Sequence, residues 1–347
     1  MKPEMYVDAV RRAVATVNAE TSGAAFSGVV AVADRDTVVY SHADGFSDRA
    51  NSVRNTDETR FGIASGTKFF TALGIARLVE FGRLTFESRI VDLLPGVFPS
   101  VDPGVTIHHL LTHTSGMYDY YDESANPDAD EFFVAVPWSS LRNPTDYLPL
   151  YHERPMVASP GEPFRYNNGA YVTLGAIIEK ITGAPYVEFI EAEILARAGM
   201  AESGFFSFNR LPSNTAAGYI ELPDGGWKIN IYNLPIRGGG DGGLYTTARD
   251  LARFWHILTT ETILSPSITQ TVLTPHIRID ANTQYGYGVY IGADADRQKL
   301  MIVGGDAGVG FASTYFAQDD VSISIFSNVT NGEEKMGNAI SAAVRLG

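Results

Sequence analysis

Apolar and β-branched runs near both ends of the chain predict β-strands. The expected strands cover residues 28–33, 37–41, 299–303, 311–316 and 321–327. The first two are separated by Asp34-Arg35-Asp36, and the last three are joined by turns rich in glycine or aspartate, which is typical of β-hairpins. Because a hairpin joins antiparallel neighbours, the pattern favours an antiparallel sheet to which both ends of the chain contribute.

Between and around these strands, apolar residues recur with the spacing of helices. The expected helices cover residues 3–20, 65–81, 170–182, 186–198, 248–258 and 333–344. The helix over 65–81 is apolar on nearly every side and is followed by Gly82, so we expect it to be buried on most sides. Gly183 ends the helix before it in the same way, and Thr247 with Asp250 has the pattern of a capping box.

Strands at both ends and helices in the middle predict an α/β (α+β) fold. The simplest arrangement is an antiparallel sheet flanked by helices, in a domain formed by residues 1–60 and 240–347. A mostly helical domain, residues 61–239, is inserted between these two parts. A cleft between two such domains is a usual place for a ligand, so we expect the functional site there.

The composition excludes several classes of function. The chain has 347 residues, with 26 Lys and Arg against 40 Asp and Glu, and its formal net charge is −14. This acidic balance argues against nucleic acid or an anionic membrane surface as a partner, since both attract basic proteins. Cysteine is absent, which rules out disulfides, a thiol nucleophile and cysteine-ligated zinc or iron–sulfur clusters.

The first residues do not resemble a secretory signal. Asp8, Arg11 and Arg12 interrupt any apolar stretch there, and no run of about 18 apolar residues occurs elsewhere in the chain. We therefore expect a soluble cytoplasmic protein, or one from which a leader has been removed.

The strongest candidate for chemistry is Ser65-Gly66-Thr67-Lys68, which opens the predicted buried helix. Ser65 and Lys68 are three residues apart, so they share a helical face. A serine hydroxyl becomes a nucleophile when a base takes its proton, and a lysine serves as that base if burial lowers its pKa. The N–H groups at the start of the helix suit a developing oxyanion. The alternative is a serine N-cap beside a lysine that reaches solvent, and these residues alone leave both interpretations open.

A second candidate is the turn-rich segment 159–169, where Tyr166 and Asn168 form the only Tyr-x-Asn of the chain. A phenol near Lys68 would relay protons, and an amide would bind a substrate carbonyl. Taken alone, the segment is better explained as a capping loop with a packed tyrosine.

Together these motifs resemble the serine β-lactamase and penicillin-binding-protein-like superfamily, in particular its branch of class C β-lactamases, D-peptidases and esterases. The resemblance runs from about residue 26 to the C-terminus. Besides Ser65-x-x-Lys68 and Tyr166-x-Asn168, it includes LLTHTSGM at 110–117, PGEPF at 160–164 and GGLYTTARDL at 242–251. It implies acylation of Ser65, with Lys68 and Tyr166 as the proton-transfer pair. It also implies that Asn168 orients the acyl side chain, that the substrate is a small ester, amide or peptide, and that no metal or organic cofactor is needed.

One motif of this superfamily is altered here. Relatives carry Lys or His, a small residue and Gly on the strand that lines the site. Counted back from Gly310-Phe311, Gly304 takes the place of the basic residue and Asp306 that of the glycine. Loss of the basic side chain weakens binding of substrate carboxylates, and an acid at 306 favours neutral or cationic substrates, unless Asp306 is only a turn residue. The same alignment makes the N–H of Ala307 the second oxyanion donor beside that of Ser65.

Three further features have structural explanations beside functional ones. The run GGGDGG at 238–243 fits a dinucleotide motif but lacks the strand that should precede it, so we expect a tight loop near the cleft. His109 and His113 are spaced like a zinc pair but lack an obvious third ligand, so we expect a structural loop. The acidic segment 118–131 is either a solvated loop or a mobile rim whose tyrosines, Tyr118, Tyr120 and Tyr121, contact substrate.

These observations predict a serine hydrolase that forms an acyl-enzyme with an ester or small amide, either an esterase or an enzyme similar to D-peptidases and amidases. Two alternatives stay open. One is a penicillin-recognising enzyme with weak β-lactamase or D,D-peptidase activity, against which the missing basic residue argues. The other is a catalytically idle relative that binds a ligand in the same cleft, which the altered motif permits.

Overall fold

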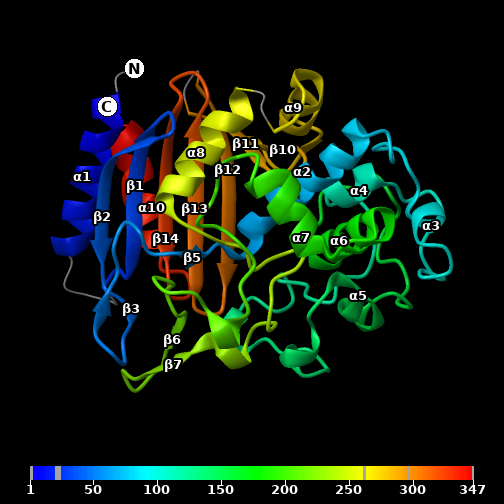
Figure 1. The fold of residues 1–347 in the computed structure, drawn as a ribbon, viewed down its shortest axis with the longest axis horizontal. Coiled ribbons are helices and arrows are strands. Elements are labelled where there is room, and N and C mark those ends of the chain that lie inside the picture. Colours follow the sequence, from blue (N-terminus) through cyan, green and yellow to red (C-terminus); the bar gives the residue numbers. More distant parts are fainter. Residues whose placement is uncertain (1–2, 20–24, 261–262, 295–296, 346–347) are drawn as a thin grey trace.

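One eight-stranded antiparallel sheet forms the centre of the protein (Figure 1). The computed structural model describes residues 3–19, 25–260, 263–294 and 297–345. In spatial order the strands are β2 (Thr37–Asp44), β1 (Gly28–Asp34), β14 (Val321–Ser327), β13 (Val309–Phe316), β12 (Arg297–Asp306), β11 (Tyr290–Asp294), β10 (Thr283–Tyr285) and β9 (Ile277–Arg278). Every neighbouring pair is antiparallel. The sheet and the helices around it confirm the predicted fold class.

Strands from both ends of the chain lie side by side in this sheet. β1 is paired on one edge with β2 and on the other with β14, where Gly28 faces Ser327. Because side chains alternate along a strand, Val29 belongs to one apolar core and Val30 to the core on the opposite face. The prediction that both ends of the chain contribute to one sheet is therefore confirmed.

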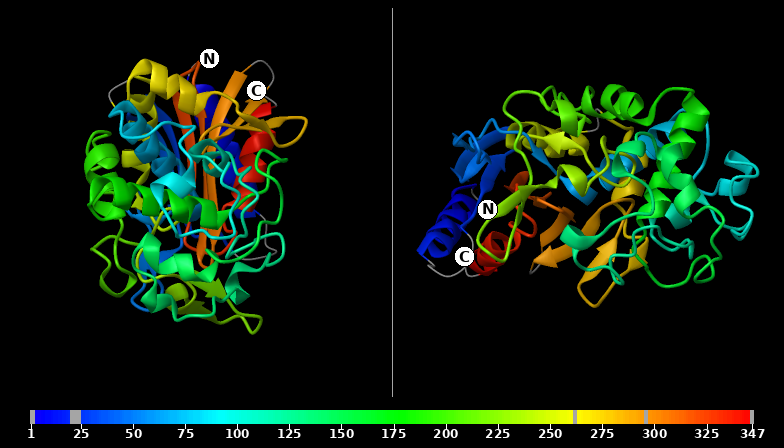
Figure 2. Two further views of the ribbon diagram at one scale, coloured as in Figure 1. Left: turned by 90° about the vertical axis from the view of Figure 1, so that its right-hand side faces the viewer. Right: turned by 90° about the horizontal axis from the view of Figure 1, so that it is seen from below.

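Helices cover both faces of the sheet (Figures 1 and 2). On one face α1 (Pro3–Ala19) and α10 (Glu334–Arg345) pack against each other and against β1 and β14. On the other face lie α8 (Ala248–Thr259) and α2 (Thr67–Glu80), and α8 is tied to β13 by a hydrogen bond from the Trp255 indole to Ser313 Oγ (2.9 Å). Within the described ranges, no helix combines the length and apolarity needed to cross a bilayer.

The segment between β2 and β9 contributes the remaining elements, most of them helical. The helices are α3 (Ile90–Leu93), α4 (Ile107–Leu111), α5 (Pro144–Tyr147), α6 (Asn168–Thr182), α7 (Tyr186–Ile190) and α9 (Pro266–Leu273). Short antiparallel pairs are formed by β3 (Phe46–Asp48) with β4 (Val53–Arg54), β5 (Phe61–Gly62) with β8 (Tyr245–Thr246), and β6 (Tyr219–Glu221) with β7 (Trp227–Ile229). Single 3₁₀ turns are η1 (Ala64–Gly66), η2 (Ala129–Glu131), η3 (Trp138–Ser140), η4 (Leu148–Leu150), η6 (Phe208–Arg210) and η7 (Asn230–Tyr232).

The structure differs from the sequence prediction in several details. Strands β9 to β11 were not predicted, because they are only two, three and five residues long and lack a β-branched run. The helix expected over 186–198 is α-helical only in α7 and continues as a π-helical segment, η5 (Glu191–Leu195). Thr247 caps α8 by accepting from the Asp250 N–H, but the Asp250 carboxylate binds the N–H of Glu202 instead of returning to the cap. Glu20, the last residue of the first predicted helix, lies outside the described residues.

Candidate active site

Ser65 lies in the 3₁₀ turn η1, which leads directly into α2. Ala64, the residue before it, has a positive φ of 42°, a conformation that is unfavourable for alanine. Thr67 braces the turn, because its hydroxyl donates to the Ala64 carbonyl (2.7 Å) and accepts from the Leu244 N–H (3.0 Å). The Ser65 side chain is thereby held, partly exposed, at the start of a buried helix.

Lys68 is buried next to Ser65, with 1% of its surface exposed. Its Nζ donates to Ser65 Oγ (2.8 Å), to Asn168 Oδ1 (2.7 Å) and to the Asp241 carbonyl (2.8 Å). Burial lowers the pKa of Lys68, and the charges of nearby carboxylates, chiefly Asp241, oppose that shift without cancelling it. A lysine with a lowered pKa gives up its own proton more readily, which suits it to act as a base toward Ser65.

Tyr166 completes this group. The Lys68 Nζ lies 4.8 Å from the centroid of its ring, and its hydroxyl shares a hydrogen bond with Ser65. The ring stacks on that of His113, with centroids 4.5 Å apart. Burial, with a further contribution from the charge of Glu123, raises the pKa of Tyr166 well above its usual range, so the phenol keeps its proton at neutral pH. The structure thus brings together the three residues that the sequence singled out, while their catalytic roles remain predictions.

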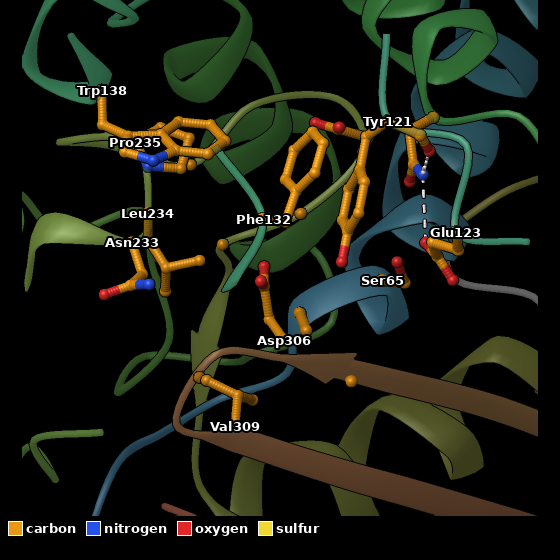
Figure 3. A pocket seen from close by; sticks show the side chains of 18 of the residues that line it. Ser65, Tyr121, Glu123, Phe132, Trp138, Asn233, Leu234, Pro235, Asp306 and Val309 are labelled. Atoms are coloured by element: carbon orange, nitrogen blue, oxygen red, sulfur yellow. Dashed lines mark hydrogen bonds between the residues drawn. The ribbon is translucent and has the colours of Figure 1, made fainter. Parts of the chain in front are cut away.

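Asn168, the first residue of α6, connects Lys68 with the rim of the site. Its Oδ1 accepts from Lys68, and its Nδ2 donates to the Tyr121 carbonyl (2.8 Å) and to Glu123 Oε1 (3.0 Å). Figure 3 shows the bond to Glu123 as a dashed line. Because these bonds occupy the amide inside the protein, its most direct effect is to orient Lys68, and the expected role in orienting the acyl group stays a prediction.

Two aspartates whose roles the sequence did not reveal surround the same group. Asp119 caps α6 by accepting from the N–H groups of Asn168 (2.8 Å) and Gly169 (2.9 Å), and burial raises its pKa to about 7. Asp241 belongs to the glycine run 238–243, and its carboxylate accepts from the Tyr120 hydroxyl (2.5 Å) while its carbonyl accepts from Lys68. The glycine run therefore places one backbone carbonyl against Lys68. Both aspartates are far from Lys68 in sequence, so only the fold identifies them.

A cavity that is partly open to solvent lies in front of Ser65. In the view of Figure 3, Ser65 is flanked by Glu123 on one side and by Asp306 on the other. The polar side chains that line the cavity are Ser65, Glu123, Asn168, Asn233, Asp241 and Asp306. The aromatic and aliphatic ones are Tyr120, Tyr121, Phe132, Trp138, Tyr147, Phe208, Leu234, Pro235, Tyr245 and Val309. Asp306 thus reaches the cavity, as its position in the sequence suggested.

The structure corrects the expected place of Gly304. A Cβ at this position would lie 2.2 Å from the Ile63 carbonyl oxygen and 2.8 Å from the Ser65 nitrogen. No side chain fits there, so Gly304 does not stand where relatives carry a basic side chain, and its contact is with the Ser65 turn.

Ala307 also differs from the expectation. It is fully buried, it does not line the cavity, and its N–H donates to Asp306 Oδ1 (2.9 Å). This N–H is therefore already engaged and is not placed as an oxyanion donor. Gly305, which follows the contact between Gly304 and the Ser65 turn, does line the cavity.

Two of the three tyrosines expected from the acidic segment line the cavity. Tyr118 does not line the cavity, because its ring packs under the Arg154 guanidinium at 4.5 Å. Tyr120 and Tyr121 line it instead, and the Tyr121 ring stacks on Phe132 with centroids 3.8 Å apart. The expectation for Tyr118 was therefore wrong, and substrate contact by Tyr120 and Tyr121 stays a prediction.

The two histidines once considered as a zinc pair have structural partners. His109 Nδ1 accepts from the Thr106 N–H (3.1 Å) at the cap of α4, and His113 Nδ1 accepts from the Asn167 N–H (3.0 Å). Across the part of the chain that the structure describes, no three His, Asp or Glu residues are grouped as a metal site.

The family model described as Beta-lactamase matches residues 10–345. The chain belongs to the Beta-lactamase family. A penicillin binding protein from Bacillus halodurans, known from its crystal structure, is 39% identical, with 96% of this chain and 99% of that one covered and a TM-score of 0.88. The resemblance inferred from the motifs is therefore confirmed.

Curated relatives extend the comparison. Penicillin-binding protein 4* of Bacillus subtilis is 31% identical over 292 residues, which cover 80% of this chain and 62% of that protein. Esterase EstB of Burkholderia gladioli is 29% identical over 252 residues, which cover 65% of this chain and 63% of that protein. The chain spans less than two thirds of the length of these two relatives.

Proposed function

We propose that this member of the Beta-lactamase family is a serine hydrolase that cleaves an ester or small amide through an acyl-enzyme. The observation that carries the proposal is the 2.8 Å hydrogen bond between Ser65 Oγ and the buried Nζ of Lys68, beside a cavity that is partly open to solvent. The substrate enters between the sheet portion, residues 1–60 and 240–347, and the mostly helical portion, residues 61–239.

In the first half of the reaction, Lys68 in its neutral form takes the Ser65 proton while Oγ bonds to the substrate carbonyl carbon. The carbonyl oxygen becomes an oxyanion that accepts hydrogen bonds from the N–H of Ser65 and, in place of Ala307, from the N–H of Gly305. The bond to the leaving group then breaks. Tyr166 gives that group its proton, because its raised pKa keeps the phenol protonated, and Lys68 returns the proton it holds to Tyr166.

In the second half, water replaces the leaving group. Lys68 takes a proton from the water, the hydroxide oxygen bonds to the acyl carbon, and the bond to Ser65 Oγ breaks as the proton returns to it. The carboxylic acid is released and Ser65 is regenerated. The esterase among the relatives supports an ester substrate, and the absence of a lysine or arginine side chain from the cavity wall argues against a substrate carboxylate.

The proposal is tested by turnover of p-nitrophenyl butanoate and of a chromogenic cephalosporin by the wild type and by Ser65→Ala. We expect the wild type to cleave the ester faster than the cephalosporin, and the variant to cleave neither. Faster turnover of the cephalosporin favours a penicillin-recognising enzyme, which the Bacillus relatives support by name. Ester turnover that survives in Ser65→Ala contradicts the mechanism.

A further inference from the structure

The wall of the cavity changes its chemistry with distance from Ser65. Close to the nucleophile stand the carboxylates of Asp306 and Glu123, and beyond Asp306 in the view of Figure 3 lie mostly apolar side chains, with the amide of Asn233 among them. The apolar wall is formed by Phe132, Trp138, Leu234, Pro235 and Val309. A substrate that fills the cavity therefore meets negative charge near its reacting carbonyl and apolar surface farther away.

Both carboxylates are held in place and keep one oxygen for a ligand. Asp306 Oδ1 accepts from the Ala307 N–H at 2.9 Å, and Glu123 Oε1 accepts from Asn168 Nδ2 at 3.0 Å. Among the described residues, the second oxygen of each accepts no hydrogen bond. The Tyr121 hydroxyl, which in Figure 3 points toward the same space, has no hydrogen-bond partner within the described chain either. Preorganised acceptors of this kind suit a donor that carries positive charge.

The cavity wall carries no positively charged side chain that could pair with these carboxylates. The residues that line it include no lysine or arginine. Lys68, the nearest basic side chain, is buried and bonded to Ser65, Asn168 and the Asp241 carbonyl, so it is directed at the catalytic group and not at the two carboxylates. An anionic substrate would be repelled without compensation, whereas a cationic one would supply the missing partner.

We propose that the site selects esters or amides that carry an ammonium group near the scissile carbonyl and an apolar group at the other end of the cavity. Asp306 and Glu123 are then specificity-determining residues that bind the ammonium. The apolar wall defined above, which includes Phe132 and Val309, receives the apolar group. This inference rests on the proposed hydrolase function, and it adds the charge and shape of the substrate.

The test compares three p-nitrophenyl esters whose acyl groups have similar size but different charge: β-alanyl (cationic), butanoyl (neutral) and succinyl (anionic). The p-nitrophenyl group serves as the apolar end. For each protein we take the ratio of kcat/KM for the β-alanyl ester to kcat/KM for the butanoyl ester. We then divide the ratio of the variant by that of the wild type, because this division cancels the intrinsic reactivity of the two esters. We expect Asp306→Asn and Glu123→Gln each to lower the ratio about tenfold, and the succinyl ester to gain in both variants.

The matched control is Glu131→Gln, which removes the same charge from the same acidic segment but from an exposed side chain outside the cavity wall. The inference is overturned if the ratio changes less than twofold in both cavity variants, or if the control lowers it as much as they do. In that case Ser65-dependent turnover of the butanoyl ester still upholds the hydrolase function. Absence of Ser65-dependent turnover of all three esters overturns that function and this inference with it.

Discussion

Replacing Gly304 with alanine tests the close contact between β12 and the turn that carries Ser65. The added Cβ would lie 2.2 Å from the Ile63 carbonyl oxygen and 2.8 Å from the Ser65 nitrogen, whereas ordinary contacts begin at 3.4 Å. Both neighbours are backbone atoms, so neither can turn away as the end of a side chain would. The strand and the turn must therefore separate by about 1 Å to admit the methyl group.

This separation affects the rate more than the stability. Overpacking of a well-packed region costs about 1–3 kcal/mol. With an unfolding entropy of about 2.1 cal/mol/K per residue, such a loss lowers the Tm of a chain of this length by about 1–4 °C. A displacement of about 1 Å between reacting groups lowers the rate about 100-fold. We therefore expect Gly304→Ala to remain folded and to lose about two orders of magnitude in kcat/KM for p-nitrophenyl butanoate.

The assay measures release of p-nitrophenolate, with thermal unfolding as the check on the fold. The control is Gly337→Ala in α10, where the new Cβ would lie at an ordinary 3.6 Å from Ile325 Cδ1. We expect the control to keep the activity and the Tm of the wild type. If Gly304→Ala behaves like the control in both measurements, β12 does not approach the Ser65 turn as described and the argument about the oxyanion site fails.

Four further substitutions test other parts of the account. Lys68→Met removes the proposed base, and we expect kcat/KM for the butanoyl ester to fall at least about 100-fold; a smaller loss would assign the base elsewhere. Tyr166→Phe should slow cleavage of a p-nitroanilide more than that of the matching p-nitrophenyl ester, because an amine needs a proton to leave and p-nitrophenolate does not; equal losses contradict a proton donor. Burial raises the pKa of Asp306 from 3.8 to about 7, so its stabilising effect is complete below pH 4 and is lost as the pH rises through 7. The Tm of the wild type minus that of Asp306→Asn should therefore fall between pH 4 and 8, and a constant difference refutes the shift. Asp119→Ala leaves two backbone N–H groups of α6 without their acceptor, and we expect urea unfolding to show a loss of about 2–4 kcal/mol, with a loss below about 0.5 kcal/mol contradicting the cap.

The sequence predicted the larger elements because their signals are local. The β-branched runs of β1 and β14, the apolar helix α2 and its end at Gly82 depend on residues close together in the chain. The grouping of Ser65, Lys68 and Tyr166 was also predicted, from one helical spacing and one resemblance. The short edge strands β9 to β11 were missed because two to five residues give no periodicity to detect.

The details of the site depend on contacts between distant segments, which the sequence could not supply. Asp241 lies 173 residues from Lys68, and its carbonyl binds Lys68 only because the glycine run folds back onto α2. The assignments of Gly304 and Ala307 failed for a related reason, since the approach of β12 to the Ser65 turn is a contact between segments that are distant in the sequence. Tyr118 was expected at the cavity with Tyr120 and Tyr121, because nothing local shows which way a ring in an irregular loop turns.

The central claim is that Ser65 forms a covalent bond with the substrate. It is tested most directly by intact mass and peptide mapping after exposure to a serine-directed phosphonate, in the wild type and in Ser65→Ala. The account predicts one adduct per chain in the wild type, located on the peptide that contains Ser65, and no adduct in the variant. An unmodified wild type, or an adduct of equal yield in Ser65→Ala, would contradict it.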